Sequence, residues 1–193
     1  MESIRTYWIK NMVCRRCLKV IKHELEEINI EVFSLELGKL TVRAINSTDK
    51  EIDSKVSDVL HTNGFEIAKS EEEKLVEEVK ITLIHLIKEL PLHLREKTSE
   101  HLASTLHRDY KILSKLFSKY ENTTIEKYFI KLKVEKVKEL IQLQQYSFSD
   151  IAYLLDYSSV NHLSRQFKNT TGISMTDYKN AEGWERSFYD EII

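Results

Sequence analysis

Residues 1–69 combine two hydrophobic periods, one of two residues and one of about 3.6 residues, in a fixed alternation. Apolar residues at every second position predict four strands, at residues 6–9, 31–37, 40–44 and 65–68. Apolar residues three and four apart predict helices over residues 16–27 and 51–60, and Asn63-Gly64 favours a left-handed end to the second helix. The resulting order, βαββαβ, is that of a ferredoxin-like sandwich.

From residue 70 onward only the helical period is present. Ser70 followed by three acidic residues is typical of a helix start, and the apolar positions from Leu75 to Leu90 predict one helix that ends before Pro91. The pattern predicts five further helices, at residues 98–106, 109–119, 125–144, 149–155 and 160–168. The chain is therefore expected to be an α+β protein with two domains, residues 1–69 and residues 70–193.

The last two of these helices form a short hairpin whose second helix has two distinct faces. Leu163 and Phe167 lie four apart and face inward, whereas Asn161, Arg165 and Lys168 fall on the opposite face. Amide and guanidinium groups can form paired hydrogen bonds with adenine and guanine edges in the major groove. The alternative for one such hairpin is an ordinary helical pair with a solvated polar face.

A similar hairpin precedes it at residues 98–122. Phe117 and Asn122 end its second helix as Phe167 and Gly172 end the later one, and both Asn and Gly accept a left-handed backbone. The long helix at 125–144 lies between the two units. Two hairpins with matching ends favour a paired DNA-binding unit over a chance pattern.

Composition adds a local charge imbalance to this picture. The chain has 193 residues and a net charge of −2, but residues 101–180 contain 12 Lys and Arg against 8 Asp and Glu, a local net charge of +4. The positive segment is the one with the paired hairpins, as contact with DNA phosphates requires. No apolar run is long enough to span a membrane and no signal peptide is evident, so a soluble cytoplasmic protein is expected.

The C-terminal half resembles the DNA-binding domain of AraC/XylS transcription regulators over roughly residues 74–180. The matching residues are Ile151-Ala152, Leu155-Asp156-Tyr157-Ser158, Leu163-Ser164-Arg165, Phe167-Lys168, Thr171-Gly172 and the helix segment from Leu132 to Leu140. The resemblance implies two helix-turn-helix units on a linker helix that enter successive major grooves, roughly 34 Å apart. Asp156 stands where the family usually has Gly, and Met175 where it often has Pro.

Carried over to this chain, the resemblance nominates residues on both recognition helices. The expected DNA-binding residues are Lys111, Ile112, Ser114 and Lys115 in the first unit and Val160, Asn161, His162, Arg165 and Lys168 in the second. Asn161 and Arg165 are the favoured base contacts. Lys168, with Lys119 and Arg108, is expected to contact phosphates, which orient a protein on DNA without specifying sequence.

The N-terminal half resembles the heavy-metal-associated domains of copper chaperones and metal-transporting ATPases. The match lies in Met12-x-Cys14-x-x-Cys17 between the first strand and helix, with Asn63-Gly64-Phe65 before the last strand. It implies that Cys14 and Cys17 bind Cu(I) or another thiophilic ion, with Met12 packed beneath the loop. A redox pair has the same spacing, and a domain that now serves dimerisation or small-ligand sensing is a further alternative.

The sequence thus predicts a sequence-specific transcription regulator that binds double-stranded DNA and responds through its CxxC loop to a thiophilic metal or to redox state. The alternative is a metal chaperone or thiol-handling protein with a helical docking module. No paired carboxylates, nucleophile elbow or phosphate loop appears, so an enzyme is not expected. The sequence leaves the oligomeric state open.

Overall fold

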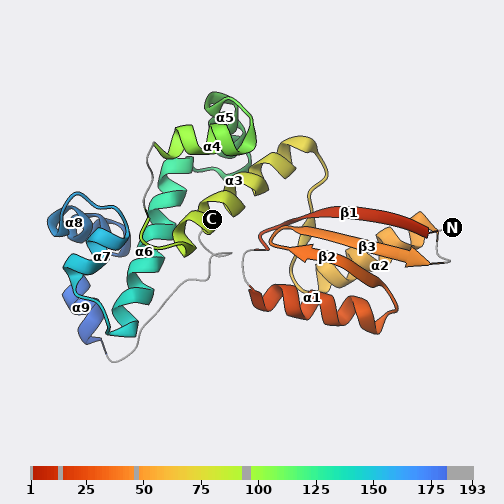
Figure 1. Cartoon of the computed structure of the whole chain (residues 1–193), viewed down its shortest axis with the longest axis horizontal. Helices are drawn as coiled ribbons and strands as arrows, with labels where there is room; N and C mark the ends of the chain where they lie inside the picture. The colour runs from red at the N-terminus through yellow and green to blue at the C-terminus, as the bar shows by residue number, and fades with distance from the viewer. Residues whose placement is uncertain (1, 13–14, 46–47, 93–96, 182–193) are drawn as a thin grey trace. The chain divides into compact units, whose positions relative to one another are not determined.

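The computed structural model describes residues 2–12, 15–45, 48–92 and 97–181 (Figure 1). The chain divides into two compact units, Met1–Ile81 and Thr82–Ile193. Within the described residues the first unit is a four-stranded antiparallel sheet with helices, and the second is helical. The predicted α+β class is confirmed.

The first unit has the βαββαβ order that its hydrophobic periods predict. Its elements are β1 (Glu2–Lys10), α1 (Arg15–Glu27), β2 (Glu31–Glu36), β3 (Lys39–Ile45), α2 (Asp49–Thr62) and β4 (Glu66–Ile67). The strands lie side by side in the order β2-β3-β1-β4, and every neighbouring pair is antiparallel. Both helices cover the same face of this sheet (Figure 1).

The core of the first unit lies between that sheet face and the two helices. Ile9 and Val42 point into it from the sheet, and Ile21 and Val56 point into it from α1 and α2; all four are fully buried. A bulge between Val32 and Ser34 lets both Val32 and Leu35 of β2 pack on the core, although they are three residues apart. The bulge turns the intervening Phe33 outward, where 56% of it is exposed.

Helix α3 (Glu71–Lys88) is shared by the two units, because the division falls inside it. Its start is capped as predicted: the Ser70 hydroxyl accepts a hydrogen bond from the Glu73 backbone N–H at 3.2 Å. The expected domain boundary, after residue 69, lies at this start, whereas the two compact units divide after Ile81. The first half of α3 belongs to the compact unit that contains the sheet.

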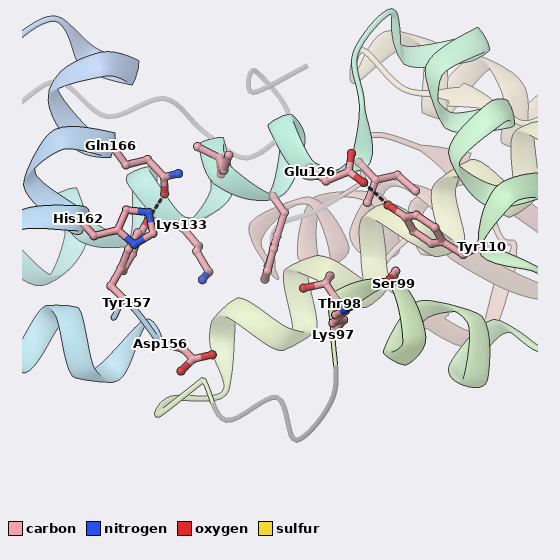
Figure 2. A pocket seen from close by; sticks show the side chains of 13 residues that line it. Lys97, Thr98, Ser99, Tyr110, Glu126, Lys133, Asp156, Tyr157, His162 and Gln166 are labelled. Atoms are coloured by element: carbon pink, nitrogen blue, oxygen red, sulfur yellow. Dashed lines mark hydrogen bonds between the residues drawn. The ribbon is translucent and has the colours of Figure 1, made fainter. Parts of the chain in front are cut away.

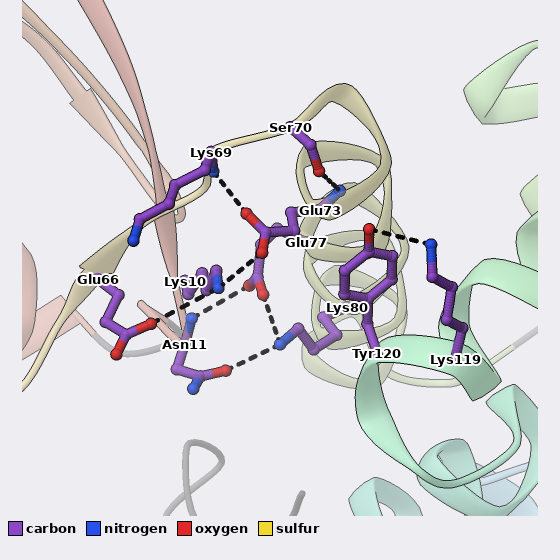
Figure 3. Close-up of polar contacts among 10 residues, drawn as sticks. All are labelled: Lys10, Asn11, Glu66, Lys69, Ser70, Glu73, Glu77, Lys80, Lys119 and Tyr120. Atoms are coloured by element: carbon purple, nitrogen blue, oxygen red, sulfur yellow. Dashed lines mark hydrogen bonds and ion pairs between the residues drawn. The ribbon is translucent and has the colours of Figure 1, made fainter.

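Polar contacts tie the first half of α3 to the loop that follows β1 (Figure 3). The Asn11 backbone N–H donates to Glu77 Oε2 at 3.1 Å, and Lys80 Nζ donates to Asn11 Oδ1 at 2.8 Å. Lys80 Nζ also lies 2.6 Å from Glu77 Oε1, and both side chains are almost completely buried. The two buried charges compensate each other while they hold the loop.

The second unit contains the remaining helices of the described chain. They are α4 (Thr98–Leu106), α5 (Tyr110–Glu121), α6 (Ile125–Leu143), α7 (Phe148–Leu154), α8 (Val160–Thr171) and α9 (Met175–Asn180). The first five follow the predicted positions within three residues at every end. Helix α9 was not predicted.

The second unit repeats itself with an offset of 50 residues, which relates α5 and the start of α6 to α8 and α9. Phe117 packs against Tyr128 with ring centroids 5.4 Å apart, and Phe167 packs against Tyr178 at 5.7 Å. Thr124 and Ser174, again 50 residues apart, cap α6 and α9 through their hydroxyls. Helix α6 thus closes the first helix-turn-helix as α9 closes the second, and it also links them.

Candidate nucleic-acid interface

Helix α5, the expected first recognition helix, is fixed by a cap and by its inward face. The Asp109 carboxylate accepts a hydrogen bond from the Lys111 N–H at 2.7 Å and so sets where the helix begins. Leu113 and Phe117 are buried. Four residues of α5 were predicted to bind DNA. Of these, Lys111, Ile112 and Lys115 are exposed, and Ser114 is partly buried.

The second recognition helix, α8, is built in the same way. The Ser159 hydroxyl accepts from the His162 N–H at 3.1 Å, and Leu163 and Phe167 are fully buried. Five of its residues were predicted to bind DNA. Val160 is partly buried, and the other four are exposed: Asn161, His162, Arg165 and Lys168. The structure therefore presents both sets of residues on helix surfaces, as DNA contact requires.

Asn161 and Arg165 have their hydrogen-bonding groups available. Neither side chain forms a hydrogen bond or ion pair with any residue that the structure describes. Both are on the same side of α8, because residues four apart lie on one helix face. A carboxamide and a guanidinium side by side can each bond two acceptor or donor atoms of a base edge.

His162 and Lys168 differ from this pair because each already has an intramolecular neighbour. His162 Nδ1 lies 3.2 Å from the Ser158 hydroxyl, and its ring meets the edge of Tyr157 at a centroid distance of 5.4 Å. Hydrogen bonds from Ser174 chiefly lower the pKa of the Asp177 carboxyl, and the charge of Lys168 makes a lesser contribution. These contacts leave the side chains of Asn161 and Arg165 less engaged than that of His162.

The turns before and after the recognition helices use left-handed residues. Asn122 and Gly172 end α5 and α8 with φ of 53° and 82°, which confirms the predicted helix ends. Asp156 has φ of 56° and makes the turn between α7 and α8. The AraC/XylS regulators that this segment resembles usually have Gly at this position. Asp accepts the left-handed backbone better than most residues.

The basic excess of residues 101–180 is not spread evenly. On α6, Lys136 pairs with Glu139 and Lys138 with Glu135, each at 2.7 Å, so these charges are balanced within the linker helix. Lys111 and Lys115 on α5 have no ion-pair partner among the described residues. Among the described residues Lys127 and Lys133 of α6 also form no ion pair, so uncompensated positive charge lies on α5 and on part of α6.

Helix α9 was missed although the sequence contains its signal. The Ser174 hydroxyl and the Asp177 carboxylate form a capping box, and Tyr178 accepts a hydrogen bond from Gln142 on α6 at 2.7 Å. The pattern Ser-x-x-Asp before an apolar position predicts a helix start. The 50-residue repeat predicts it as well, because Thr124 begins a helix at the equivalent position.

The CxxC loop follows β1 in the first unit. Met12 is fully buried in the core, as the resemblance implied, and Cys17 lies near the start of α1, partly buried and disulfide-bonded. Cys14 lies outside the described residues. A sulfur in a disulfide is not a thiolate, so metal binding by Cys14 and Cys17 requires reduction first. In the described part of the chain, no group of three or more His, Cys, Asp or Glu side chains is arranged to hold a metal ion.

Residues 102–181 match the family model of a helix-turn-helix domain of the AraC type. This region begins inside α4 and extends one residue beyond α9, so it contains both recognition helices. No curated protein and no solved structure matches the chain. The match supports a DNA-binding transcription regulator, and it covers none of the CxxC unit.

None of the helices within residues 2–12, 15–45, 48–92 and 97–181 is long and apolar enough to cross a membrane.

Proposed function

We propose that this chain is a sequence-specific transcription regulator that reads double-stranded DNA with α5 and α8. The observation that carries the proposal is the matched pair of capped helices with exposed polar residues at equivalent positions. Lys111 and Lys115 on α5 correspond to Asn161 and Arg165 on α8, each 50 residues apart. Two such helices on one linker suit successive major grooves of one DNA face.

The roles proposed for individual residues follow from their chemistry and surroundings. Asn161 and Arg165 read base edges, because their groups are exposed and unengaged within the described chain. Lys111, Lys115 and Lys168 supply charge near the backbone, and Lys115 additionally suits a guanine edge. Ile112, half exposed, suits contact with a thymine methyl group.

The test is selection of binding sites from random-sequence DNA with the full chain. An enriched motif with two parts about one helical turn apart is expected. Arg165→Ala should cost about 1–3 kcal/mol and relax one base position, whereas Lys168→Ala should weaken all sequences alike. Lys127 is an exposed lysine on α6, and Lys127→Ala is the matched control. It should change neither the overall DNA affinity nor the preference at any base position. Failure to enrich any motif, with reduced and with oxidised protein, would contradict the proposal.

We further propose that the thiol state of the CxxC loop adjusts DNA affinity. Supporting observations are the disulfide at Cys17 and the bonds from Asn11, in the segment that leads to this loop, to Glu77 and Lys80 on α3. Helix α3 then continues without interruption into the second unit. A change in the loop therefore acts on a helix that both units share.

The experiment compares the DNA dissociation constant of oxidised protein, reduced protein, and reduced protein loaded with Cu(I) without oxygen. A change of at least fivefold between two of these states is expected, corresponding to about 1 kcal/mol. Cys17→Ser should fix a single affinity across all three conditions. Equal affinities in wild-type protein would contradict thiol control and leave the DNA-binding proposal intact. A change seen only with Cu(I) would favour metal over redox as the signal.

A further inference from the structure

A cavity of about 470 Å³ lies in the second unit, between the two helix-turn-helix pairs and α6 (Figure 2). Lys97 and Thr98 border it from the start of α4, Phe129 and Lys133 from α6, and Tyr157 from the turn before α8. Cavities that hold small molecules in proteins have volumes of about 300–1,000 Å³. This one is large enough; of the residues predicted to contact DNA, His162 alone lines it, and the CxxC loop supplies none of its walls.

Lys133 is the chemically distinctive group in this cavity. Its Nζ lies 5.3 Å from the ring centre of Phe129 and 4.9 Å from that of Tyr157. Figure 2 shows the side chain extending from α6 into the space that Asp156 and Thr98 border. No carboxylate forms an ion pair with it among the described residues. Burial lowers the pKa of this ammonium, and the charge of Asp156 offsets only part of that effect.

The remaining walls favour a ligand with one acidic end and an apolar body. Lys97, the residue before α4, makes no side-chain capping hydrogen bond, so the first backbone N–H groups of that helix, at the cavity edge, have no side-chain cap. Ile125, Phe129 and Ile130 supply apolar surface from α6. Glu126 also lines the cavity, where the Tyr110 hydroxyl donates to it at 2.5 Å, and no ion pair joins it to Lys133.

We propose that this cavity binds a small organic anion, with its carboxylate or phosphate at Lys133 and its apolar body against Phe129 and Ile130. Such a ligand contacts both helix-turn-helix pairs at once, because residues of α4 and of the α7–α8 turn both line the cavity. It would stabilise one separation of the two recognition helices. DNA affinity and ligand affinity are then coupled, and each changes the other by the same factor. This coupling rests on the proposed function, whereas ligand binding itself does not.

Ligand binding is tested on the full chain without DNA, by titration calorimetry with 2-naphthoate, its uncharged amide 2-naphthamide, and inorganic phosphate. Naphthoate should bind with a dissociation constant of about 1 mM or tighter, and more tightly than either other probe. Lys133→Met should weaken naphthoate binding at least tenfold, or about 1.4 kcal/mol, without changing naphthamide binding, since a hydrogen bond to a charged group is lost. Lys133→Arg should retain naphthoate binding, and the control Lys127→Met should behave as wild type.

Equal binding of naphthoate and naphthamide, or undiminished naphthoate binding by Lys133→Met, would overturn the proposal. So would the absence of any binding. A DNA phosphate is the other possible source of the anion, and the DNA arm distinguishes it. If Lys133→Met lowers the slope of log affinity against log salt by about one with no ligand present, Lys133 belongs to the DNA interface and the small-molecule site is rejected. An unchanged slope, with an operator affinity that naphthoate alters only when Lys133 is present, supports the proposal.

Discussion

At the scale of single residues, the turns of this chain depend on side chains that tolerate positive φ. Six residues other than glycine have positive φ in the described chain, and three of them are Asn. Asn and Gly signal such positions in a sequence, and Asn122 and Gly172 were predicted for this reason. His107 and Gln144 also adopt it, at the C-terminal caps of α4 and α6, although neither residue type signals it in a sequence.

Asp156 gives the most direct test of backbone strain. Replacing it with Gly should stabilise the second unit by about 1 kcal/mol, because Gly adopts φ of 56° without a Cβ clash. Hydrogen exchange of α8 backbone amides measures the effect on that unit alone. Asp156→Asn should be nearly neutral, and a less stable Asp156→Gly protein would contradict the strain argument.

The capping carboxylates Asp150 and Asp177 predict a pH dependence. Hydrogen bonds from the Ser147 and Ser174 hydroxyls lower the pKa of each in the folded state. The unfolded chain therefore binds protons first as pH falls, so stabilisation by the caps is complete above about pH 5 and is lost progressively below about pH 4.

The same amide-exchange measurement, repeated between pH 6 and pH 3, tests the caps. The double variant Asp150→Ala, Asp177→Ala should be less stable than wild type at pH 6 and should lose less of its stability on acidification. Curves for the two proteins that stay parallel over the whole range would contradict this role.

At the scale of helices and strands, most of the fold was predictable, because the buried face of each element places apolar residues at regular intervals along the sequence. The strands at β1 to β4 and the helices α1 to α8 all coincide with apolar residues at the appropriate period. Two departures have local causes. The bulge at Val32 breaks the alternation of β2, and α9 is too short for a period to be visible, so that only its capping box marks it.

Long-range polar contacts were not predictable in this way. Nothing in the spacing of Asn11, Glu77 and Lys80 indicates that they meet, since residues 66 and 69 positions apart are joined only by the packing of α3. The contacts of His162 with Tyr157 and Ser158 could not be predicted from the sequence either. The periodicity assigned His162 correctly to a polar helix face but carried no information about its neighbours.

The buried pair on α3 gives an element-scale prediction. Lys80→Met removes the ammonium 2.6 Å from the Glu77 carboxylate and should cost the first unit about 3–5 kcal/mol. Lys74→Met is the control on the same helix: its partner Glu71 is largely exposed, and the cost should stay below about 1 kcal/mol. Amide exchange of β1 and β3 provides the measurement. Similar losses for both variants would show that burial of the pair is irrelevant.

At the scale of the whole molecule, the two recognition helices are equivalent in position but not in chemistry. We expect the double variant Ile112→Ala, Lys115→Ala to alter only one part of the bipartite motif recovered by selection, and the double variant Asn161→Ala, Arg165→Ala to erase base preference in the other part. The two affected parts should be about 10 base pairs apart. Loss of information across the entire motif from either double variant would contradict independent reading by α5 and α8.

The 50-residue repeat has one more consequence for the proposed function. A duplicated unit with unlike side chains gives a single chain two different ends along the DNA, so its operator need not be a palindrome. Turning the operator around within a promoter would preserve affinity and exchange which helix-turn-helix lies nearer the transcription start. The chain would then bind as strongly but face the polymerase with its other end, and regulation should depend on operator direction.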